Sequence, residues 1–592
     1  MIRKRILRYR AGTEKLVNTD QVHPLLARIY RNRKIVSVDE LDKSLQQLAP
    51  YSLLKGIDTA CDLLEHSLLQ AQRIVIIGDF DADGATSTAV AVRALRMMGA
   101  QEVEFLVPNR FAFGYGLSPE IVDEAAKLDP TLIVTVDNGI ANIDGVNRAR
   151  QLGIKVLITD HHLAGDELPD ADAIVNPNQP GDEFPAKGTA GVGVIFYVML
   201  ALRARLRNTG WFASLGIEEP NLAQLLDIVA LGTVADVVPL EKNNRILVAQ
   251  GLKRIRAGMV CPGIRALLEV SGRRIENVVS SDFGFAIGPR LNAAGRLDDM
   301  SIGIQCLLSD DFHTARLFAE QLHQLNNERK QIESAMQEQA LEILESLRLS
   351  ANDEIPKGIT LFNPEWHQGV IGILASRIKD RYHRPTIVFA QDNPADVKGS
   401  ARSIPGIHIR DILDRISKRH PGLLKKFGGH AMAAGLSLSL ENLDQFSSAF
   451  DEEISGISEN EEIEGTIHSD GELEQDSFSI DIAQMLRSAE PWGQSFPEPL
   501  FDGYFIILEQ RVVGEKHLKL RLRPLDSTHA LDAIAFGVID ASADYVPFEA
   551  GNQIHIAYRL DVNEFRGRQS LQLMIEHIQQ ADDVRIEVCN VN

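Results

Sequence analysis

Residues 74–84 read Ile-Val-Ile-Ile-Gly-Asp-Phe-Asp-Ala-Asp-Gly, a β-branched run followed directly by three alternating aspartates. Comparable runs recur at residues 103–107, 132–136 and 156–159, and the intervals leave room for one helix between each pair, most clearly at 84–98. Near-continuous apolar character is typical of parallel strands that are covered on both faces. The pattern therefore predicts an α/β fold with a doubly wound parallel sheet, whose functional sites form at the carboxyl ends of the strands.

The three aspartates of this stretch, Asp79, Asp81 and Asp83, would project to one side of an extended chain. Clustered carboxylates repel one another unless cations hold them, and their hard oxygen atoms suit Mg²⁺ or Mn²⁺. An EF-hand loop also begins D-x-D-x-D-G, but it requires a glutamate at its twelfth position, where this chain has Val90, and a helix before the loop. A solvated acidic turn remains the other interpretation.

Two later strands are followed by the same kind of side chain. Asp137 comes after the run 132–136, and Asp160, His161 and His162 come after the run 156–159. A single aspartate after a strand is often only a helix cap. Several such strand ends would converge at one edge of a parallel sheet, however, and their ligands would suit two cations. Asp236 stands in an apolar surrounding, where a metal would offset the cost of burying its charge.

The motifs together resemble those of a known superfamily. Residues 79–83, 136–139, 160–162 and 234–236 are similar to the four motifs of the DHH phosphoesterases. Residues 290–296, 366–372, 399–402 and 428–430, with a β-rich C-terminal part, narrow the resemblance to the RecJ single-stranded-DNA exonucleases over nearly the whole chain. The resemblance implies a 5′→3′ exonuclease that releases mononucleotides, requires two Mn²⁺ or Mg²⁺ ions, and acts in DNA repair, recombination and mismatch repair.

The resemblance also implies a role for each residue of the site. Asp137 would bridge two ions, with Asp79 and Asp81 on the first. Asp83, His161 and Asp236 would bind the second. His162 would face the scissile phosphate and Asp160 would orient the histidine pair, although His162 taken alone is also explained as a structural or helix-capping histidine.

Further residues are expected to hold the nucleic acid, because a phosphodiester chain needs cations for its backbone and flat surfaces for its bases. Arg110 lies with three aromatic residues in residues 108–115, two of which, Phe111 and Phe113, could equally be core residues. The remaining candidates are expected in Gly-bearing loops or nearer the active site. The resemblance assigns Arg110, Ser400 and Arg402 to the 5′ phosphate. His430 is expected in the same part of the chain as Ser400 and Arg402. Arg290, Asn292 and Arg296 are assigned to the path of the strand.

The length of 592 residues predicts roughly four domains. We expect an N-terminal segment (1–65), a DHH catalytic domain (66–308), a connector helix (309–350), a second α/β, DHH-associated domain (351–455), and an acidic linker with an OB-like β-barrel that binds nucleic acid (456–592). Residues 310–347 contain neither Gly nor Pro, which predicts one long helix, although an ordinary bundle helix would look similar. The barrel is predicted from short alternating runs such as 518–523 and 554–559.

Composition does not exclude a nucleic-acid partner. The net charge is 61 − 82 = −21, but residues 441–490 hold 15 acids and one base, so the rest of the chain is nearly balanced. Four widely separated cysteines favour a reducing cytoplasm over a disulfide framework or a zinc knuckle. The longest uncharged run, 188–202, has 15 residues, short of the about 20 needed to cross a bilayer. We therefore expect a cytoplasmic enzyme with no membrane association.

Two other functions stay open on the sequence. One is a different DHH phosphodiesterase acting on short RNA, cyclic dinucleotides or pyrophosphate. The other is a catalytically inactive protein that binds single strands. A repair exonuclease would act with a single-strand-binding protein and a helicase, and we expect a monomer, but no residues for such contacts are evident.

Overall fold

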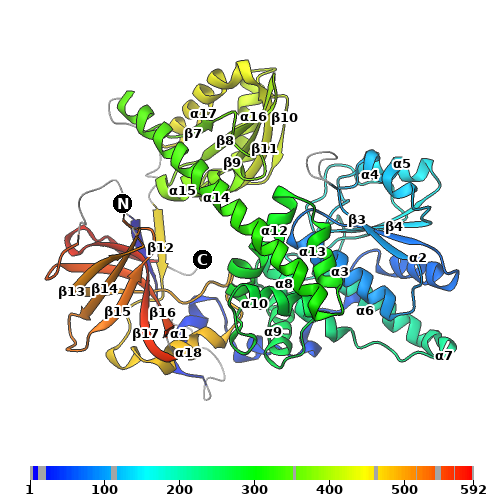
Figure 1. The fold of residues 1–592 in the computed structure, drawn as a ribbon, viewed down its shortest axis with the longest axis horizontal. Helices are drawn as coiled ribbons and strands as arrows, with labels where there is room; N and C mark the ends of the chain where they lie inside the picture. Colours follow the sequence, from blue (N-terminus) through cyan, green and yellow to red (C-terminus); the bar gives the residue numbers. More distant parts are fainter. Residues whose placement is uncertain are drawn as a thin grey trace. The chain divides into compact units, whose positions relative to one another are not determined.

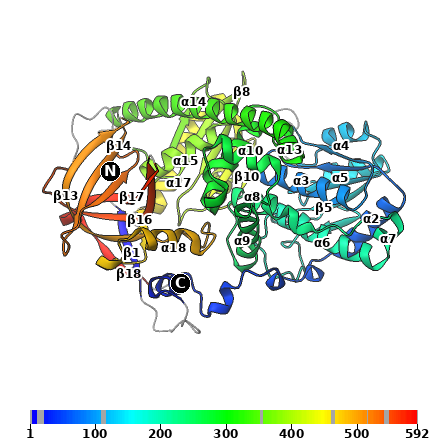
Figure 2. The ribbon, with the colours of Figure 1, turned by 60° about the horizontal axis from the view of Figure 1, so that its bottom comes forward.

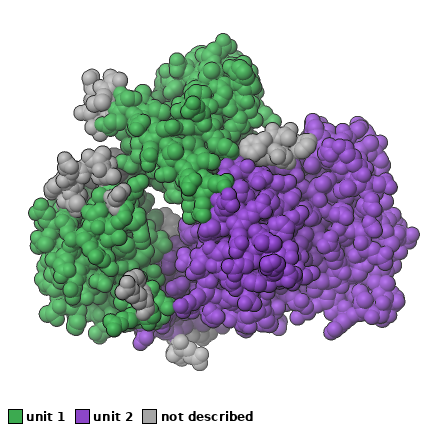
Figure 3. Space-filling view, viewed as in Figure 1, with its two compact units in different colours: residues 1–10, 327–480, 500–592 green, residues 11–326, 481–499 purple. Residues whose placement is uncertain are grey.

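The computed structural model describes residues 4–10, 22–108, 116–350, 355–458, 465–514, 516–539, 548–565 and 567–589. Two compact units make up the chain (Figure 3). Unit 2 holds residues 11–326 and 481–499, and unit 1 holds residues 1–10, 327–480 and 500–592.

A parallel five-stranded sheet forms the centre of unit 2. Its order is β3-β2-β4-β5-β6, and every neighbouring pair is parallel. All residues of β2 and β4 are buried, as their apolar sequences predict. The strands are β2 (Ile74–Ile77), β3 (Val103–Leu106), β4 (Leu132–Val136), β5 (Lys155–Thr159) and β6 (Ala173–Val175).

Helices cover both faces of this sheet. Figures 1 and 2 show α4 (Pro119–Ala126) and α5 (Ile143–Gln151) on one face, and α2 (Ile57–Leu69) and α6 (Gly191–Asn208) on the other. Alternate residues of the strands, such as Val75 and Ile133, pack with Ile121 and Val146 of the first helix pair in one apolar cluster. The prediction of a doubly wound sheet is therefore confirmed.

A group of further helices completes unit 2. Helix α3 (Ala82–Met97) packs against α6 and against α8 (Leu226–Ala235), and a single π-helical turn, η6 (Phe283–Ile287), leads directly into α12 (Gly288–Leu297). The other α-helices of this part are α1 (Pro24–Asn32), α7 (Trp211–Leu215), α9 (Lys242–Arg256), α10 (Pro262–Val270), α11 (Ser280–Asp282), α13 (Ser301–Leu308) and α18 (Ile480–Ala489).

The long segment without Gly or Pro forms one continuous helix. This helix, α14, extends over Phe312–Ser350 and has 39 residues. The boundary between the two compact units falls within it, after Asn326.

The second lobe, in unit 1, is a mixed sheet with helices. Its strand order is β10-β11-β9-β8-β7, in which only β7 and β8 are parallel. The strands are β7 (Ile359–Phe362), β8 (Thr386–Asn393), β9 (Asp396–Arg402), β10 (Lys426–Gly429) and β11 (Ala433–Ser439), and the helices are α15 (Ile371–Tyr382), α16 (Ile409–Arg419) and α17 (Leu443–Ser458). The predicted second α/β part is present.

The C-terminal part forms the expected barrel, which closes in the order β13-β14-β15-β17-β16. Its strands are β13 (Phe501–Val513), β14 (His517–Pro524), β15 (Leu531–Ala535), β16 (Gln553–Phe565) and β17 (Arg568–Gln580). A separate parallel sheet joins the ends of the chain, because β1 (Lys4–Tyr9) pairs with both β12 (Gly465–Ser469) and β18 (Ile586–Cys589).

The acidic stretch contains regular structure. It includes all of α17, β12 and α18, and the carboxylate of Glu490. That carboxylate is buried and accepts a hydrogen bond from Lys43 Nζ at 2.6 Å. Across the described residues, no helix combines the length and the apolar character needed to span a bilayer.

Candidate active site

The sheet brings the predicted motifs to one edge. Strands β2, β4 and β5 are neighbours in register, so their carboxyl ends lie together. The aspartates of residues 79–83 follow β2, Asp137 follows β4, and the Asp-His-His motif follows β5. Asp236 reaches the same place from the C-terminal cap of α8. Potential ligand atoms lie within 4.8 Å of one another in three groups: Asp79, Asp81 and Asp137; Asp83, His161 and Asp236; Asp137, His161 and His162.

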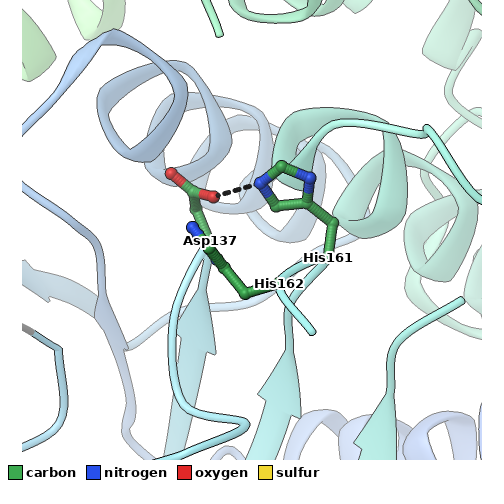
Figure 4. A group of neighbouring side chains, drawn as sticks. All are labelled: Asp137, His161 and His162. Carbon is green, nitrogen blue, oxygen red and sulfur yellow. Dashed lines mark ion pairs between the residues drawn. The ribbon is translucent and has the colours of Figure 1, made fainter. Parts of the chain in front are cut away.

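His161 is the meeting point of two carboxylates. Its Nε2 atom lies 3.2 Å from Asp137 Oδ1 and 3.4 Å from Asp236 Oδ2, and Figure 4 shows the Asp137 carboxylate directed at the ring. Both His161 Nε2 and Asp236 Oδ2 are buried, and neither has a hydrogen-bond partner among the described residues. Burial, with the charge of His162, lowers the pKa of His161 to about 4, so the ring is neutral at pH 7, as a metal ligand must be.

The carboxylates of the site repel one another. Burial and the charge of Asp81 raise the pKa of Asp83 to about 7. Burial and neighbouring aspartates, Asp83 foremost, also hold the pKa values of Asp137 and Asp236 well above the ordinary range. A cluster of this kind keeps its charges only with cations between them. The carboxylate oxygens and the unpartnered imidazole nitrogen fit hard divalent ions such as Mn²⁺ or Mg²⁺.

Backbone groups at the start of α6 fix the position of Asp83. Gly191 N donates to Oδ2 at 2.7 Å and Val192 N donates to Oδ1 at 3.0 Å. A Cβ atom at Gly191 would lie only 2.7 Å from the Cβ atom of Asp137, so this position requires glycine. The sequence singled out neither residue for the site, because the uncharged run 188–202 indicated only a buried helix.

Asp160 orients the histidine pair. Its Oδ1 atom accepts hydrogen bonds from His161 N at 2.7 Å, His162 N at 3.1 Å and His162 Nδ1 at 2.8 Å. Burial would raise the pKa of Asp160, but its hydrogen bond to His162 and the charge of that ring hold it below the ordinary value. Burial lowers the pKa of His162, yet Asp160 outweighs this effect and raises it to about 9. Thus His162 is the charged member of the pair.

Two asparagines that sequence reasoning missed support the same loop. Asn178 Nδ2 donates to His161 O at 2.6 Å, and Asn176 Nδ2 donates to His162 O at 2.9 Å. Both residues follow β6, and no pattern in the sequence distinguishes them from ordinary turn residues.

The residues predicted to line the path of the strand differ in their surroundings. Asn292 Oδ1 accepts a hydrogen bond from Ala82 N at 2.8 Å, which ties α12 to the loop of the three aspartates. Arg290 is buried and donates to Ala286 O at 2.6 Å and to His323 Nδ1 at 3.1 Å. Arg296, in the last turn of α12, is partly buried. Asn292 thus directly contacts the aspartate loop through a hydrogen bond.

The second-lobe candidates lie partly on a strand. Ser400 and Arg402 were expected in Gly-bearing loops, but this expectation is wrong, because both belong to β9. Residues 396–402 alternate between buried and more exposed positions, as a strand does. Arg402 Nη1 lies 3.1 Å from Ser400 Oγ, and a Cβ atom at Gly372, near the start of α15, would lie 2.9 Å from Arg402 Nη2 and from Ser400 Oγ. His430 directly follows β10. Arg110, Phe111 and Phe113 lie outside the described residues.

Comparison with known proteins gives the same order of parts along the chain. Residues 73–233 match the DHH family, N-terminal domain, residues 356–456 the DHHA1 domain, and residues 469–577 the RecJ OB domain. A protein of Dickeya dadantii named single-stranded-DNA-specific exonuclease RecJ is 55% identical over 94% of this chain and 96% of its own length. The chain belongs to the RecJ family.

Other RecJ relatives extend the comparison to solved structures. The Escherichia coli protein of the same name is 52% identical over 94% of this chain and 96% of its own length. The crystal structure of RecJ from Thermus thermophilus in complex with Mn²⁺ has a TM-score of 0.79 and 29% identity, covering 99% of this chain and 81% of that one. The complex with Mg²⁺ has a TM-score of 0.74 and 28% identity, covering 98% and 79%. The RecJ fold, and the Mn²⁺ and Mg²⁺ of these two complexes, agree with the predicted architecture and the predicted choice of ions.

Proposed function

We propose that this member of the RecJ family is a metal-dependent exonuclease that degrades single-stranded DNA in the 5′→3′ direction to mononucleotides. The observation that carries the proposal is the meeting of five carboxylates with the buried, unpartnered Nε2 atom of His161 at one edge of the sheet. This arrangement occurs in a chain that is 55% identical to a protein named single-stranded-DNA-specific exonuclease RecJ. We propose the predicted role in DNA repair, recombination and mismatch repair on the same basis.

The residues divide between two ion positions. Asp79 and Asp81 would hold one ion, Asp83, His161 and Asp236 the other, and Asp137 would bridge them. Two ions supply a nucleophile at neutral pH and stabilise the charge that develops on the phosphate. The chain contributes the geometry: α6 fixes Asp83, and Asp137, with a φ of 62°, places its carboxylate 3.2 Å from His161 Nε2.

His162 acts on the substrate through its second nitrogen. Asp160 accepts the Nδ1 proton, which leaves Nε2 as a donor toward the scissile phosphate. Because the pKa of His162 is raised to about 9, the ring carries a positive charge at pH 7 and attracts the phosphate. Asp160 is therefore a positioning residue, and His162 is the residue proposed to contact the reacting group.

Recognition of the 5′ phosphate is assigned to the second lobe. Ser400 Oγ, the Arg402 guanidinium and the backbone near Gly372 at the start of α15 converge on one place. A hydroxyl, a guanidinium and a helix N-terminus together are suited to a phosphate. Arg110 and His430 are proposed as further contacts, and Arg290, Asn292 and Arg296 as the side of the path nearer the metal centre.

The remaining parts fit a long single strand as substrate. The barrel, which matches the RecJ OB domain, would hold unpaired nucleotides by stacking and charge. We propose the predicted domain limits, a cytoplasmic location, a monomeric state, and action beside a single-strand-binding protein and a helicase. An enzyme for short RNA or cyclic dinucleotides would not need this barrel, and an inactive binding protein would not keep the full set of carboxylates.

One assay tests the proposal. Oligonucleotides of DNA and RNA with 5′-phosphate, 5′-hydroxyl or blocked ends are incubated with the protein and Mn²⁺, Mg²⁺ or EDTA. We expect mononucleotides from the 5′ end of single-stranded DNA with either metal and none with EDTA. Release from the 3′ end, preference for RNA, or hydrolysis in EDTA would contradict the proposal.

A further inference from the structure

Two buried asparagines of unit 2 make the same set of contacts. Asn138, directly after Asp137, is fully buried, and Asn244, in α9, is 1% exposed. In each residue Nδ2 donates hydrogen bonds to backbone carbonyls of two different segments, while Oδ1 is buried and has no hydrogen-bond partner among the described residues. The reverse orientation would set Oδ1 against two carbonyl oxygens that cannot donate, so the direction of each amide is fixed. Both residues thus keep two donors in place at the cost of a buried acceptor without a partner.

Asn138 connects the two strands that precede ligands of one proposed ion position. Its Nδ2 atom lies 3.1 Å from Ile77 O, at the end of β2, and 2.9 Å from Val136 O, at the end of β4. The last backbone pair of these strands joins Ile77 to the residue before Val136, so the amide continues their pairing beyond the sheet. Asp79 comes two residues after Ile77 and Asp137 directly after Val136, and both aspartates belong to one group of potential ligands. The amide therefore ties together the two loops from which these carboxylates project.

Asn244 connects two segments that serve the other proposed ion position. Its Nδ2 atom lies 2.7 Å from Gly188 O and 2.8 Å from Pro239 O. A Cβ atom at Gly188 would lie 3.4 Å from Pro239 Cδ, so the two segments are in contact. The segment of Gly188 leads into the start of α6, whose amides bind Asp83, and Pro239 follows Asp236 by three residues. Since Asp83 and Asp236 belong to one group of potential ligands, this amide ties together the segments that hold them.

An amide nitrogen with two protons is suited to such a link, because it can hold two carbonyls at a fixed separation. Asn178 makes a similar link between His161 O and Lys187 O, at 2.6 Å and 3.1 Å. We propose that Asn138 and Asn244 (the amide clamps) are positioning residues, each of which holds together two segments that carry the ligands of one divalent cation. Removal of groups that support metal ligands typically lowers metal affinity or activity by about 10–100-fold. The inference rests on the proposed division of the ligands between two ions, and it gives a role to two residues outside the ligand set.

Binding of Mn²⁺ in the absence of nucleic acid tests the inference. The electron paramagnetic resonance signal of free Mn²⁺ gives the number of bound ions and their Kd for wild type, Asn138→Ala and Asn244→Ala. We expect wild type to bind two ions and each variant to bind one of them about 10–100-fold more weakly. In hydrolysis, kcat should fall while KM for the strand stays unchanged, and a higher Mn²⁺ concentration should restore kcat. Two ions bound by both variants with the Kd values of wild type would overturn the inference.

Double variants assign each amide clamp to its ion. Asp81→Asn removes a ligand of one proposed position, and Asp236→Asn removes a ligand of the other. Asn138→Ala should leave one ion with nearly wild-type affinity when it is combined with Asp81→Asn, but it should weaken both ions when it is combined with Asp236→Asn. Asn244→Ala should show the opposite pattern. The same number of tightly bound ions in all four double variants would overturn the inference.

Asn243→Ala is the matched control. Asn243 is also a buried asparagine of α9, but its Oδ1 atom accepts hydrogen bonds from Ala49 N at 3.1 Å and Tyr197 OH at 2.8 Å, and it joins neither pair of segments. This variant should bind both ions as wild type does, even where its melting temperature falls. A loss of Mn²⁺ affinity equal to that of the clamp variants would overturn the inference.

Serine variants cover the case of an alanine variant that circular dichroism shows to be unfolded. Asn138→Ser and Asn244→Ser keep one donor, and each should weaken one ion less than alanine does. A folded serine variant with the Mn²⁺ binding of wild type overturns the inference. Failure of wild type itself to bind two ions, or to hydrolyse the strand, would instead contradict the proposed function.

Discussion

Asp137 combines an unfavourable backbone conformation with a buried carboxylate. Its backbone has a φ of 62°, its side chain is buried, and neighbouring carboxylates with burial raise its pKa well above the ordinary range. A residue held against these costs is typical of a functional position. It belongs to two of the groups that could hold a metal ion, which supports the bridging role proposed for it.

We therefore predict that Asp137→Ala abolishes hydrolysis, with a loss of at least about 10³-fold, which corresponds to about 4 kcal/mol. Binding of single strands in EDTA should survive or strengthen, because a buried negative charge disappears. Steady-state hydrolysis of a labelled oligonucleotide and fluorescence anisotropy without metal measure the two effects. If the variant kept a tenth of normal turnover, a loss of only about 1.4 kcal/mol, the bridging role would have to be abandoned.

Asp502 shows how a buried carboxylate is held when no metal is needed. Burial raises its pKa, but hydrogen bonds from His555, Arg8 and Ser469 outweigh burial and lower it to about 2. Because the pKa in the folded chain is below the ordinary value of 3.8, the charge stabilises the fold above about pH 4, and this stability is lost as the pH falls through about 2. The full effect is about 2 kcal/mol, of which about half remains at pH 3.

The prediction for Asp502 is a stability difference that depends on pH. Asp502→Asn should be less stable than wild type at pH 5, and the difference should shrink at pH 3, because a protonated carboxyl resembles an amide. Urea unfolding of both proteins at the two pH values measures it. A difference that stays constant, or grows toward pH 3, would show that the charge of Asp502 does not stabilise this part of the chain.

Among the elements, α12 shows how a helix contacts the loop of residues 79–83. Asn292 binds Ala82 N, and a Cβ atom at Gly295 would lie 1.8 Å from Phe80 O, so the helix approaches the loop closely through a residue without a side chain. Replacing a helical glycine by alanine usually stabilises a helix by about 1 kcal/mol. At Gly295 the clash with backbone should outweigh that gain, because overpacking costs about 1–3 kcal/mol or more.

Gly295→Ala is accordingly predicted to lower both the melting temperature and kcat, whereas Gly456→Ala, in α17 with no atom within 4 Å of the added Cβ, should leave kcat unchanged and raise stability slightly. Differential scanning calorimetry and the oligonucleotide assay compare the pair. Equal behaviour of the two variants would mean that α12 does not control the position of residues 79–83.

The sequence identified elements with a local pattern and missed those without one. Strands β2 and β4 were predictable because their runs are apolar except for Thr135, and α14 because 39 residues lack any helix breaker. The π-helical turn η6 could not be predicted, since its Phe-Gly-Phe-Ala-Ile sequence has no periodicity that distinguishes it from α-helix. Ser400 was expected in a loop because glycine precedes it, but the alternation of burial in β9 depends on its neighbours β8 and β11.

At the scale of the whole chain, long-range pairing limited what the sequence could predict. Except for Asp236, which caps α8, the carboxylates of the candidate site could be grouped, because each follows a strand of one predicted sheet. The supporting contacts of Asp83 with α6 and of His161 with Asn178 join segments that no local motif relates. Strand β1 is the extreme case, since Ile6 pairs with Ile586 and with Ile467. A basic first segment gives no indication that it completes a sheet with the last residues.

This pairing predicts that the first residues of the chain support the C-terminal barrel, the part proposed to hold the strand. Arg8 Nη2 lies 2.6 Å from Asp502 Oδ2, whose side chain is fully buried, whereas Arg5 pairs with the exposed Glu587 at 3.2 Å. Removing one partner of a buried ion pair costs about 3–5 kcal/mol, but an exposed pair contributes about 0–1 kcal/mol. Arg8→Met should thus destabilise the barrel and weaken binding of long single strands, while hydrolysis of short oligonucleotides persists, because the residues proposed to bind metal belong to unit 2.

Arg5→Met is the matched control and should change neither the stability of the barrel nor the binding of long strands. Hydrogen exchange of β13 and fluorescence anisotropy with strands of increasing length measure both variants. Equal effects of the two substitutions would contradict the role given to β1, and loss of short-strand hydrolysis in a folded Arg8→Met would contradict the division of labour between the barrel and the metal centre.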